Sequence, residues 1–167
     1  VDLGRGVRED QAGGEMGPVL THGGASGVGT AAIQLAREAG CRVVATAGSQ
    51  EKVDCCRSLG AELVVNYRNR DFADAVLDHC DGVDVILDIV AGSYLEQNLK
   101  SLKPCGRLVV ISLLGGSEGS LDLAAVLGKR LRIIGSLLRS RPIEEKIAIV
   151  SQFDDRFWQL LVDGRVA

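Results

Sequence analysis

The stretch VLTHGGASGVG at residues 19–29 decides the fold class of this chain. Its apolar start predicts a short buried strand, its glycines predict a turn, and the amphipathic pattern over residues 28–39 predicts a helix. A strand, a glycine turn and a helix in this order form an anion site, because the helix N-terminus presents unpaired N–H groups and a positive dipole end. We interpret the stretch as a dinucleotide-binding turn, although the spacing Gly24-x-Ser26-x-x-Gly29 lacks the middle glycine of the usual fingerprint. The alternative is an ordinary tight strand-to-helix turn.

Length and composition indicate a single globular domain. The chain has 167 residues, of which 46% are hydrophobic and 25% charged, and its net charge is −3. Such a charge gives no indication of a nucleic-acid or membrane partner, and no apolar run approaches the ~20 residues that span a bilayer. We therefore expect no nucleic acid and no membrane among its partners.

The five cysteines bear on the metal and compartment predictions. Their spacing matches neither a zinc pattern nor a Cys-x-x-Cys motif, so we expect no metal site. An odd number of cysteines in an α/β chain suggests reduced thiols, and no signal peptide is visible. A cytoplasmic protein is the expectation.

Strand and helix patterns alternate from Pro18 onward and predict an α/β fold. We expect a doubly wound parallel (Rossmann) sheet of about six strands. After the first strand, further strands are expected at residues 42–46, 63–66, 83–89, 107–112 and 131–136. Helices are expected at residues 28–39, 50–59, 72–80, 94–101, 121–129 and 143–162. We expect residues 1–17 to be an irregular or disordered leader and residues 18–167 to be the cofactor-binding domain.

The segment after the second expected strand favours NADP(H) as the cofactor. An NAD site usually has an Asp or Glu there, but residues 45–52 read ATAGSQEK, so the acid is missing where the strand ends. Ser49 can donate a hydrogen bond and Lys52 adds a positive charge in the first turn of the next helix. Tyr67 follows the third strand and can donate its hydroxyl. Alternatively, Lys52 is merely solvated and Tyr67 lies at the edge of the core. The negative charge of Glu51, next to Lys52, argues mildly against a phosphate.

Two turns rich in small residues follow the fourth and fifth strands. Ligands of open parallel sheets lie beyond the carboxyl ends of the strands, so these turns are expected to flank the nicotinamide. Asp88, at the end of the fourth strand, is expected to cap a turn rather than to catalyse. His22 and His79 are expected to be structural, and we name no catalytic residue.

Several motifs in the same order resemble a known family. The segments HGGASGVG (22–29), TAGS (46–49), NYR (66–68) and SLLRSR (136–141) resemble the zeta-crystallin-like quinone oxidoreductases of the medium-chain dehydrogenase/reductase superfamily, closest to their tumour-suppressor-inducible type. The resemblance covers roughly residues 19–165. It implies a zinc-free reductase that uses NADPH to reduce quinone-like small molecules.

The resemblance also assigns residues to the cofactor site. The glycine turn would hold the pyrophosphate, the next group would bind the adenosine 2′-phosphate, and the two small-residue turns would border the nicotinamide. These residues are Gly24, Ala25, Ser26, Gly27, Val28 and Gly29 for the pyrophosphate, Ser49, Lys52 and Tyr67 for the phosphate, and Val90, Ala91, Gly92, Leu113, Leu114 and Gly115 for the nicotinamide.

Family members are about twice as long, and their N-terminal substrate domain has no counterpart here. We therefore expect a cofactor domain without its substrate domain, and three functions stay open: a quinone reductase, an NADPH-binding fragment without turnover, and the cofactor domain of an enoyl reductase. The apolar stretch from Leu131 to Leu138 is expected to lie at the edge of the sheet. Such an edge invites a second strand, so we expect a homodimer; the alternative is a monomer whose edge is solvated by its arginines.

Overall fold

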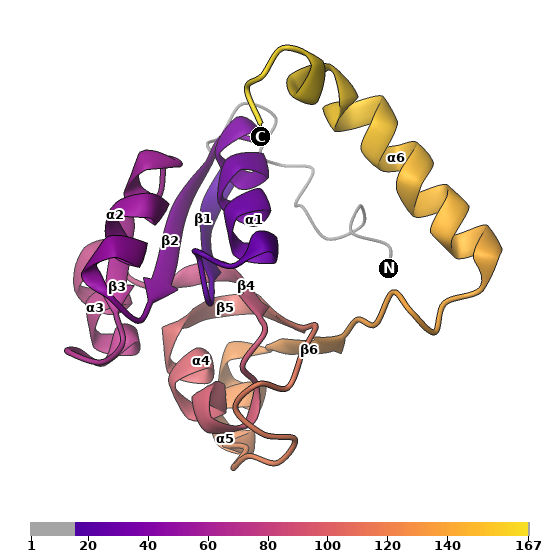
Figure 1. Cartoon of the computed structure of the whole chain (residues 1–167). Helices are drawn as coiled ribbons and strands as arrows, with labels where there is room; N and C mark the ends of the chain where they lie inside the picture. Colours follow the sequence, from indigo (N-terminus) through magenta and orange to yellow (C-terminus); the bar gives the residue numbers. More distant parts are fainter. Residues whose placement is uncertain (1–15, 167) are drawn as a thin grey trace.

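The computed structural model describes residues 16–166, which form one parallel sheet with helices on both faces (Figure 1). The strands are β1 (Met16–Thr21), β2 (Cys41–Ala47), β3 (Leu63–Asn66), β4 (Val83–Asp88), β5 (Leu102–Val110) and β6 (Arg132–Gly135). The helices are α1 (Gly27–Glu38), α2 (Gln50–Ser58), α3 (Phe72–Cys80), the 3-10 turn η2 (Gly92–Tyr94), α4 (Leu95–Ser101), α5 (Leu123–Lys129) and α6 (Ile143–Val162). The elements occur in the order that the sequence predicted.

The order of the strands confirms the doubly wound fold. Within the described residues the six strands are arranged β3-β2-β1-β4-β5-β6, and every neighbouring pair is parallel. The chain leaves β1 in one direction to build β2 and β3, and then returns to build β4, β5 and β6 on the other side. β1 and β4 therefore lie side by side at the point where the order reverses, which is where ligands bind in such sheets.

The two faces of the sheet have separate apolar cores. On one face, Ile33 of α1 and Val53 and Cys56 of α2 pack against β2 and β3. On the other face, Phe72 and Val76 of α3 pack against β1, β4 and β5, and the start of α4 adds to this core. The near-continuous apolar runs of the strands are thus explained by burial on both faces.

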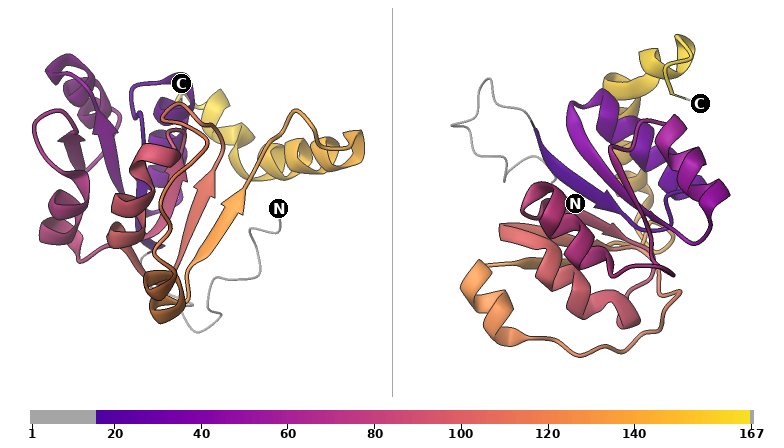
Figure 2. Two further views of the ribbon diagram at one scale, coloured as in Figure 1. Left: turned by 90° about the horizontal axis from the view of Figure 1, so that it is seen from below. Right: turned by 90° about the vertical axis from the view of Figure 1, so that its left-hand side faces the viewer.

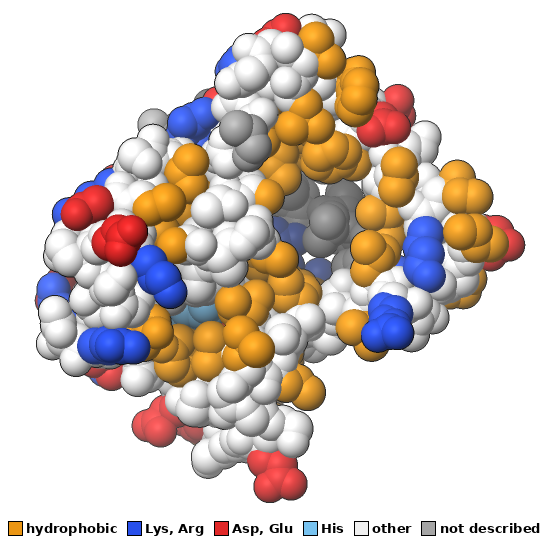
Figure 3. Space-filling model, viewed as in Figure 1, with side chains coloured by type: hydrophobic (Ala, Val, Ile, Leu, Met, Phe, Trp, Pro, Cys, Tyr) orange, Lys and Arg blue, Asp and Glu red, His pale blue; other side chains and the backbone are white. Residues whose placement is uncertain are grey.

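The last helix differs from the others. α6 has 20 residues and extends away from the sheet (Figures 1 and 2). None of its residues, all of which are described, is buried. Apolar side chains gather on the flank of α6 that faces the rest of the domain (Figure 3). The chain then returns to α1, where Arg165 pairs with Glu38 and its carbonyl oxygen accepts a hydrogen bond from Arg37.

The structure corrects two expected boundaries. β1 begins at Met16, so Met16 and Gly17 belong to the strand and not to the expected leader at residues 1–17; residues 1–15 lie outside the described part. β5 begins at Leu102, five residues before the expected start at residue 107. Its register against β4 shifts over the intervening residues, which include Cys105 at a φ of 65°.

Candidate cofactor-binding site

The glycine turn lies between β1 and α1 at the carboxyl end of the sheet. Ser26 caps α1, because its hydroxyl oxygen accepts a hydrogen bond from Gly29 N at 3.1 Å. A side chain at Gly29 would place a Cβ 2.3 Å from Gly23 O and 2.7 Å from the backbone of Gly24. Glycine at position 29 therefore lets the helix approach the turn closely. Ser26, which stands where the usual fingerprint has its middle glycine, has a structural role at the helix N-terminus.

A small pocket of about 140 Å³ opens beside this turn. It is lined by Gly23, Ala25, Ser26, Ala47, Gly48, Lys52 and Tyr67. The structure thus brings together residues from the glycine turn, from the end of β2 and from the segment after β3. These described lining residues include one cation, Lys52, and no carboxylate.

Two local features shape this pocket. Ser49 caps α2, with its hydroxyl 3.4 Å from Lys52 N, so the positive end of α2 points toward the pocket side of β2. Gly48 makes room for Tyr67, since a Cβ at position 48 would lie 2.4 Å from the Tyr67 hydroxyl. Of the three residues expected near a phosphate, Lys52 and Tyr67 line the pocket and Ser49 is not among its lining residues.

The turns after β4 and β5 are joined to each other. Gly115 N donates to Val90 O at 2.7 Å, and Gly92 N donates to the carbonyl oxygen of Gly116 at 3.1 Å. Ala91 has a φ of 63°, which is unusual for a residue other than glycine. These bonds bring Val90, Ala91 and Gly92 together with Gly115. Leu113 and Leu114 are exposed, and Leu113 also lines a wide groove of about 820 Å³ beside β6 and the start of α6.

Below both turns lies a group of buried polar side chains. His22, Thr46, Asp88 and Asn98 are all fully or almost fully excluded from solvent. Asp88 Oδ1 accepts hydrogen bonds from Val90 N at 2.7 Å and from Ala91 N at 3.0 Å, which confirms the expected turn cap. His22 is buried and hydrogen-bonded, as expected for a structural histidine, and burial lowers its pKa below the ordinary value.

Sequence reasoning missed Thr46 and Asn98. Their partners lie 24 and 76 residues away in the chain, so no local spacing indicates them. The one available signal was that Thr46 and Asn98 are polar residues at positions where the pattern expects apolar, buried ones. A buried polar side chain usually has a hydrogen-bond partner.

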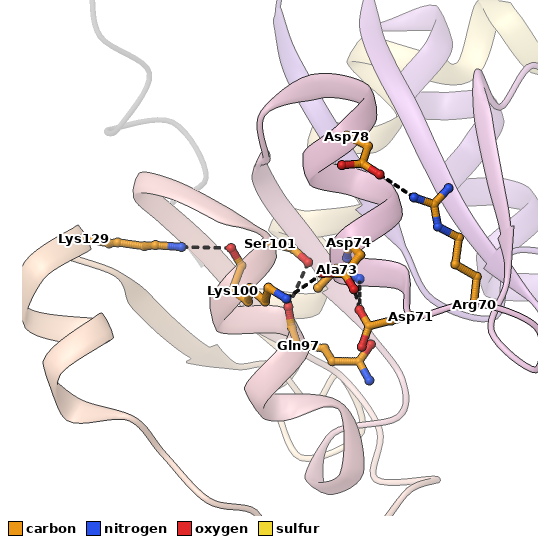
Figure 4. Close-up of polar contacts among 9 residues, drawn as sticks. All are labelled: Arg70, Asp71, Ala73, Asp74, Asp78, Gln97, Lys100, Ser101 and Lys129. Atoms are coloured by element: carbon orange, nitrogen blue, oxygen red, sulfur yellow. Dashed lines mark hydrogen bonds and ion pairs between the residues drawn. The ribbon is translucent and has the colours of Figure 1, made fainter.

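Helix α4, which provides Asn98, is fixed by ionic and hydrogen-bonded contacts (Figure 4). Lys100 pairs with Asp74 of α3 at 2.6 Å. The Lys129 ammonium donates to the carbonyl oxygens of Leu99, Lys100 and Leu102 at the end of α4, and burial lowers the pKa of Lys129. The helix is thus held against α3 on one side and α5 on the other.

Comparisons with known proteins show the family. The zinc-binding dehydrogenase family matches residues 27–153. The quinone oxidoreductase of Mus musculus is 37% identical over 131 residues, which are 76% of this chain and 39% of that protein.

Two solved structures are similar as well. The quinone oxidoreductase of Escherichia coli complexed with NADPH is 25% identical, with a TM-score of 0.76 over 89% of this chain and 46% of that chain. A putative enoyl reductase domain of a polyketide synthase is 33% identical, with a TM-score of 0.73 over 90% of this chain and 83% of that chain. The chain spans about two-fifths of the length of the mouse relative.

The described residues, 16–166, do not fit the zinc ion that the family's description names. In residues 16–166 no group of three or more His, Cys, Asp or Glu side chains is placed to hold a metal ion. We therefore derive no chemistry from zinc. A search of the same residues for a helix with the length and apolar character needed to cross a membrane finds none.

Proposed function

The chain belongs to the zinc-binding dehydrogenase family of the medium-chain dehydrogenase/reductase superfamily, and from this premise we propose that it is the NADPH-binding domain of a zinc-free, zeta-crystallin-like quinone oxidoreductase. The observation that supports NADPH most strongly is the small pocket at the end of β2, which has a lysine and a tyrosine and no carboxylate among its described lining residues. The pyrophosphate would lie on the turn at residues 24–29, against the N-terminus of α1.

The preference for NADPH over NADH follows from charge. A 2′-phosphate beside Lys52 gains a charge-assisted contact, and the N-terminus of α2 adds its positive potential. The Tyr67 hydroxyl, which lies over Gly48, can donate to the same phosphate. The Ser49 hydroxyl at the helix start is a further donor.

The test is a titration of the purified chain with NADPH and NADH. We expect tighter binding of NADPH, and the variant Lys52→Ala should lose roughly 1.5–3 kcal/mol of binding free energy for NADPH. Arg57→Ala is the matched control, because it removes the same charge from the opposite end of α2. Equal affinity of the wild type for both cofactors contradicts the proposal.

When bound, the nicotinamide would supply a hydride to an acceptor. The residues of this chain would orient its ring, with Val90–Gly92 on one side and Leu113–Gly115 on the other. We propose a quinone as the acceptor and slow turnover by this chain alone, since positioning of the two reactants supplies ~7–11 kcal/mol of the barrier. An assay with an ortho-quinone and NADPH should give a kcat below ~1 per second.

A second candidate is the cofactor domain of an enoyl reductase. The solved enoyl reductase domain favours it, because the match extends over 83% of that chain. NADPH oxidation measured in parallel with a quinone and with an enoyl thioester distinguishes the candidates. Binding of NADPH without oxidation by either substrate indicates a binding module.

We further propose that two copies pair through β6, which lies at the end of the sheet. Ser136 N donates to Val110 O at 2.9 Å, so Ile134 N also faces β5, and the N–H groups of Ile133 and Gly135 face the open edge. Ile133→Pro removes an edge donor, whereas Ile133→Ala keeps it. Sedimentation should show a dimer for the wild type and Ile133→Ala, and a monomer for Ile133→Pro. A wild-type monomer overturns this interface.

The cysteines support a reducing, cytoplasmic setting as part of the proposal. All five are free thiols. Burial raises the pKa of Cys41 and Cys80, and it raises that of Cys56 to about 11, so these thiols stay protonated at neutral pH. Thiols in this state react slowly with disulfides.

A further inference from the structure

We propose that His22 is a positioning residue that joins the glycine turn to the loop at residues 90–92 through an unbroken chain of hydrogen bonds, whose four side chains are buried. The inference deepens the proposed function, on which it rests for the assignment of the two ends to the pyrophosphate and the nicotinamide. The chain of hydrogen bonds consists of Gly23, Thr46, His22, Asn98, Asp88, Val90 and Ala91.

The first half of this chain leads from the glycine turn to the ring of His22. Gly23 N donates to the hydroxyl oxygen of Thr46 at 3.3 Å. That hydroxyl lies 3.0 Å from Nδ1 of His22. Thr46 is the penultimate residue of β2, next to the strand end that lines the small pocket. The glycine turn and the end of β2 are thus tied to the same ring.

The second half leads from the ring to the loop after β4. Nε2 of His22 lies 2.7 Å from Oδ1 of Asn98, and Nδ2 of Asn98 donates to Oδ2 of Asp88 at 2.8 Å. The other oxygen of Asp88 accepts from Val90 N and Ala91 N. One carboxylate therefore connects helix α4 to the loop.

The donors and acceptors fix the direction of every bond. The Asp88 carboxylate only accepts, so the Asn98 amide nitrogen faces it and the amide oxygen faces His22. Nε2 of His22 must then carry the proton, which leaves Nδ1 as an acceptor for the Thr46 hydroxyl. The Thr46 oxygen is free to accept from Gly23 N. A neutral imidazole satisfies each of these bonds, in agreement with the lowered pKa.

Two features make the chain of bonds stiff. His22, Thr46, Asp88 and Asn98 are each 0% exposed, so water does not compete for the hydrogen bonds among these four side chains. At its end, Ala91 is held at a φ of 63°, which L-residues adopt at a cost and keep only where the surroundings enforce it. The Asp88 cap enforces it here. A displacement of the glycine turn is therefore transmitted to the loop at residues 90–92 through these hydrogen bonds.

The alternative is that His22 merely fills space. Its ring does pack edge-on against Phe72 and Tyr94, with ring centroids 4.7 and 4.9 Å away. Pure packing predicts that loss of a hydrogen-bonding group lowers stability without changing distant backbone positions. The two explanations therefore differ in what happens at Val90 and Ala91.

The first experiment needs no cofactor. Amide NMR shifts of Val90 and Ala91 are compared in the wild type and in Thr46→Val, and again in Asn98→Leu and the double variant. We expect Thr46→Val to move these amides in the wild-type background and not in the Asn98→Leu background. Unmoved amides in the wild-type background, or equal movement in both backgrounds, overturn the proposal.

Ser101→Ala is the matched control for Asn98→Leu. Ser101 is a buried residue of the same helix, and its hydroxyl donates to Gln97 O at 2.8 Å, outside the chain of bonds (Figure 4). Its loss should lower stability while the response of Val90 and Ala91 to Thr46→Val persists. Loss of that response in Ser101→Ala would contradict the proposal.

A second experiment tests the consequence for binding. Affinities for NADPH and for adenosine 2′,5′-bisphosphate, which lacks the nicotinamide half, are measured for the wild type and Asn98→Leu. We expect the variant to lose about ten-fold for NADPH and less than about two-fold for the bisphosphate. Equal losses for both ligands overturn the proposal. A wild type that binds neither ligand refutes the proposed function, while the cofactor-free NMR experiment still decides the role of His22.

The wild type alone provides a measurement for the case in which Asn98→Leu does not fold. Nitrogen NMR of the His22 ring at neutral pH should show a neutral imidazole with its proton on Nε2. A ring with its proton on Nδ1, or a charged ring, overturns the proposal, because either state breaks the sequence of donors and acceptors.

Discussion

The two ends of the sheet differ in how completely helices cover them. In the first region, residues 16–66, Ile33, Val53 and Cys56 are buried between helices and sheet. In the second region, residues 123–162, neither α5 nor α6 has a buried residue, and all residues of both helices are described. The small pocket beside the glycine turn, which we propose as the phosphate site, thus lies in the region whose helices are packed on the sheet. The first region therefore contributes more buried apolar surface to the stability of this chain than the second region does.

The exposed apolar surface of the second region has a physical meaning of its own. Ile147, Val150 and Trp158 of α6 are each more than half exposed, and Leu127 of α5 is 80% exposed. Apolar side chains gathered in this way are typical of surfaces that become buried against another body. They contribute little to the stability of the chain in the arrangement described here.

The sharpest test of this comparison is a pair of isoleucines, one from each region. Ile33 is 0% exposed and Ile147 is 62% exposed. Ile33→Ala should lower the free energy of unfolding by about 2–5 kcal/mol, because it removes buried methyl groups and leaves a cavity. Ile147→Ala should change it by less than about 0.5 kcal/mol. Chemical denaturation measures both, and similar losses for the two variants would show that α6 is packed in solution.

The same contrast shows what the sequence could predict. The succession of strands and helices along the chain followed from apolar runs and glycine turns, which are local signals. The early start of β5 was missed because Pro104 and Gly106 indicate a turn, whereas the strand continues through a shift of register against β4. Such a shift depends on the partner strand and leaves no local pattern. The amphipathic pattern of α6 predicted the helix but could not indicate what covers it.

The site divides in a similar way. The segments that follow the strands could be grouped because a doubly wound sheet gathers the carboxyl ends of its strands, and Lys52 and Tyr67, from the segments after β2 and β3, do line one pocket. The bonds of His22 with Thr46 and Asn98 could not be predicted, since they join residues that are distant in the chain by side-chain geometry alone. The topology of the sheet predicts which loops lie close together, but it does not predict which buried side chains form hydrogen bonds.

A pair of glycines tests the difference in packing at closer range. A Cβ at Gly29 would lie 2.3 Å from a backbone oxygen, whereas one at Gly128 of α5 would meet no atom within 4 Å. Gly29→Ala should lower the free energy of unfolding by about 1–3 kcal/mol and weaken NADPH binding. Gly128→Ala should raise it by about 0.5–1 kcal/mol, because alanine favours the helix. A Gly29→Ala variant as stable as the wild type would contradict the close approach of α1 to the turn.

Lowering the pH should reduce the free energy of unfolding through His22, a residue of the first region. The chain has two histidines, and neither lies in the second region. Burial, opposed by the Asn98 hydrogen bond and the Asp88 charge, lowers the His22 pKa below its ordinary value of 6.5. Below that value the unfolded chain binds a proton that the folded chain does not, so the free energy of unfolding falls as the pH decreases.

The measurement compares the wild type with His22→Gln between about pH 6.5 and pH 5.5. The wild type should lose up to about 1.4 kcal/mol per pH unit more than the variant. His79 is present in both proteins, so its contribution cancels. Parallel stability curves for the two proteins would show that His22 is protonated as easily in the folded chain as in the unfolded one.

The smallest effect concerns surface charge, which should not distinguish the two regions. Arg42 and Glu62 form a two-pronged ion pair at 2.7 and 2.9 Å in the first region, and Arg141 pairs with Glu145 at 2.7 Å in the second. The Arg42 guanidinium lowers the pKa of Glu62 to about 2, so its stabilisation is present above the ordinary pKa of 4.5 and is lost as the pH falls toward 2.

Double-mutant cycles to alanine should give a coupling energy of about 0.2–1 kcal/mol for either pair, because partly exposed charges are screened by water and salt. Added salt should reduce both values. A much larger coupling energy for the pair of the first region would show that surface charge also contributes to the difference in stability between the regions. Equal coupling energies would leave apolar burial as the cause of the difference between the regions. The two ends of the sheet would then differ in the apolar surface that their helices bury and not in the strength of their surface ion pairs.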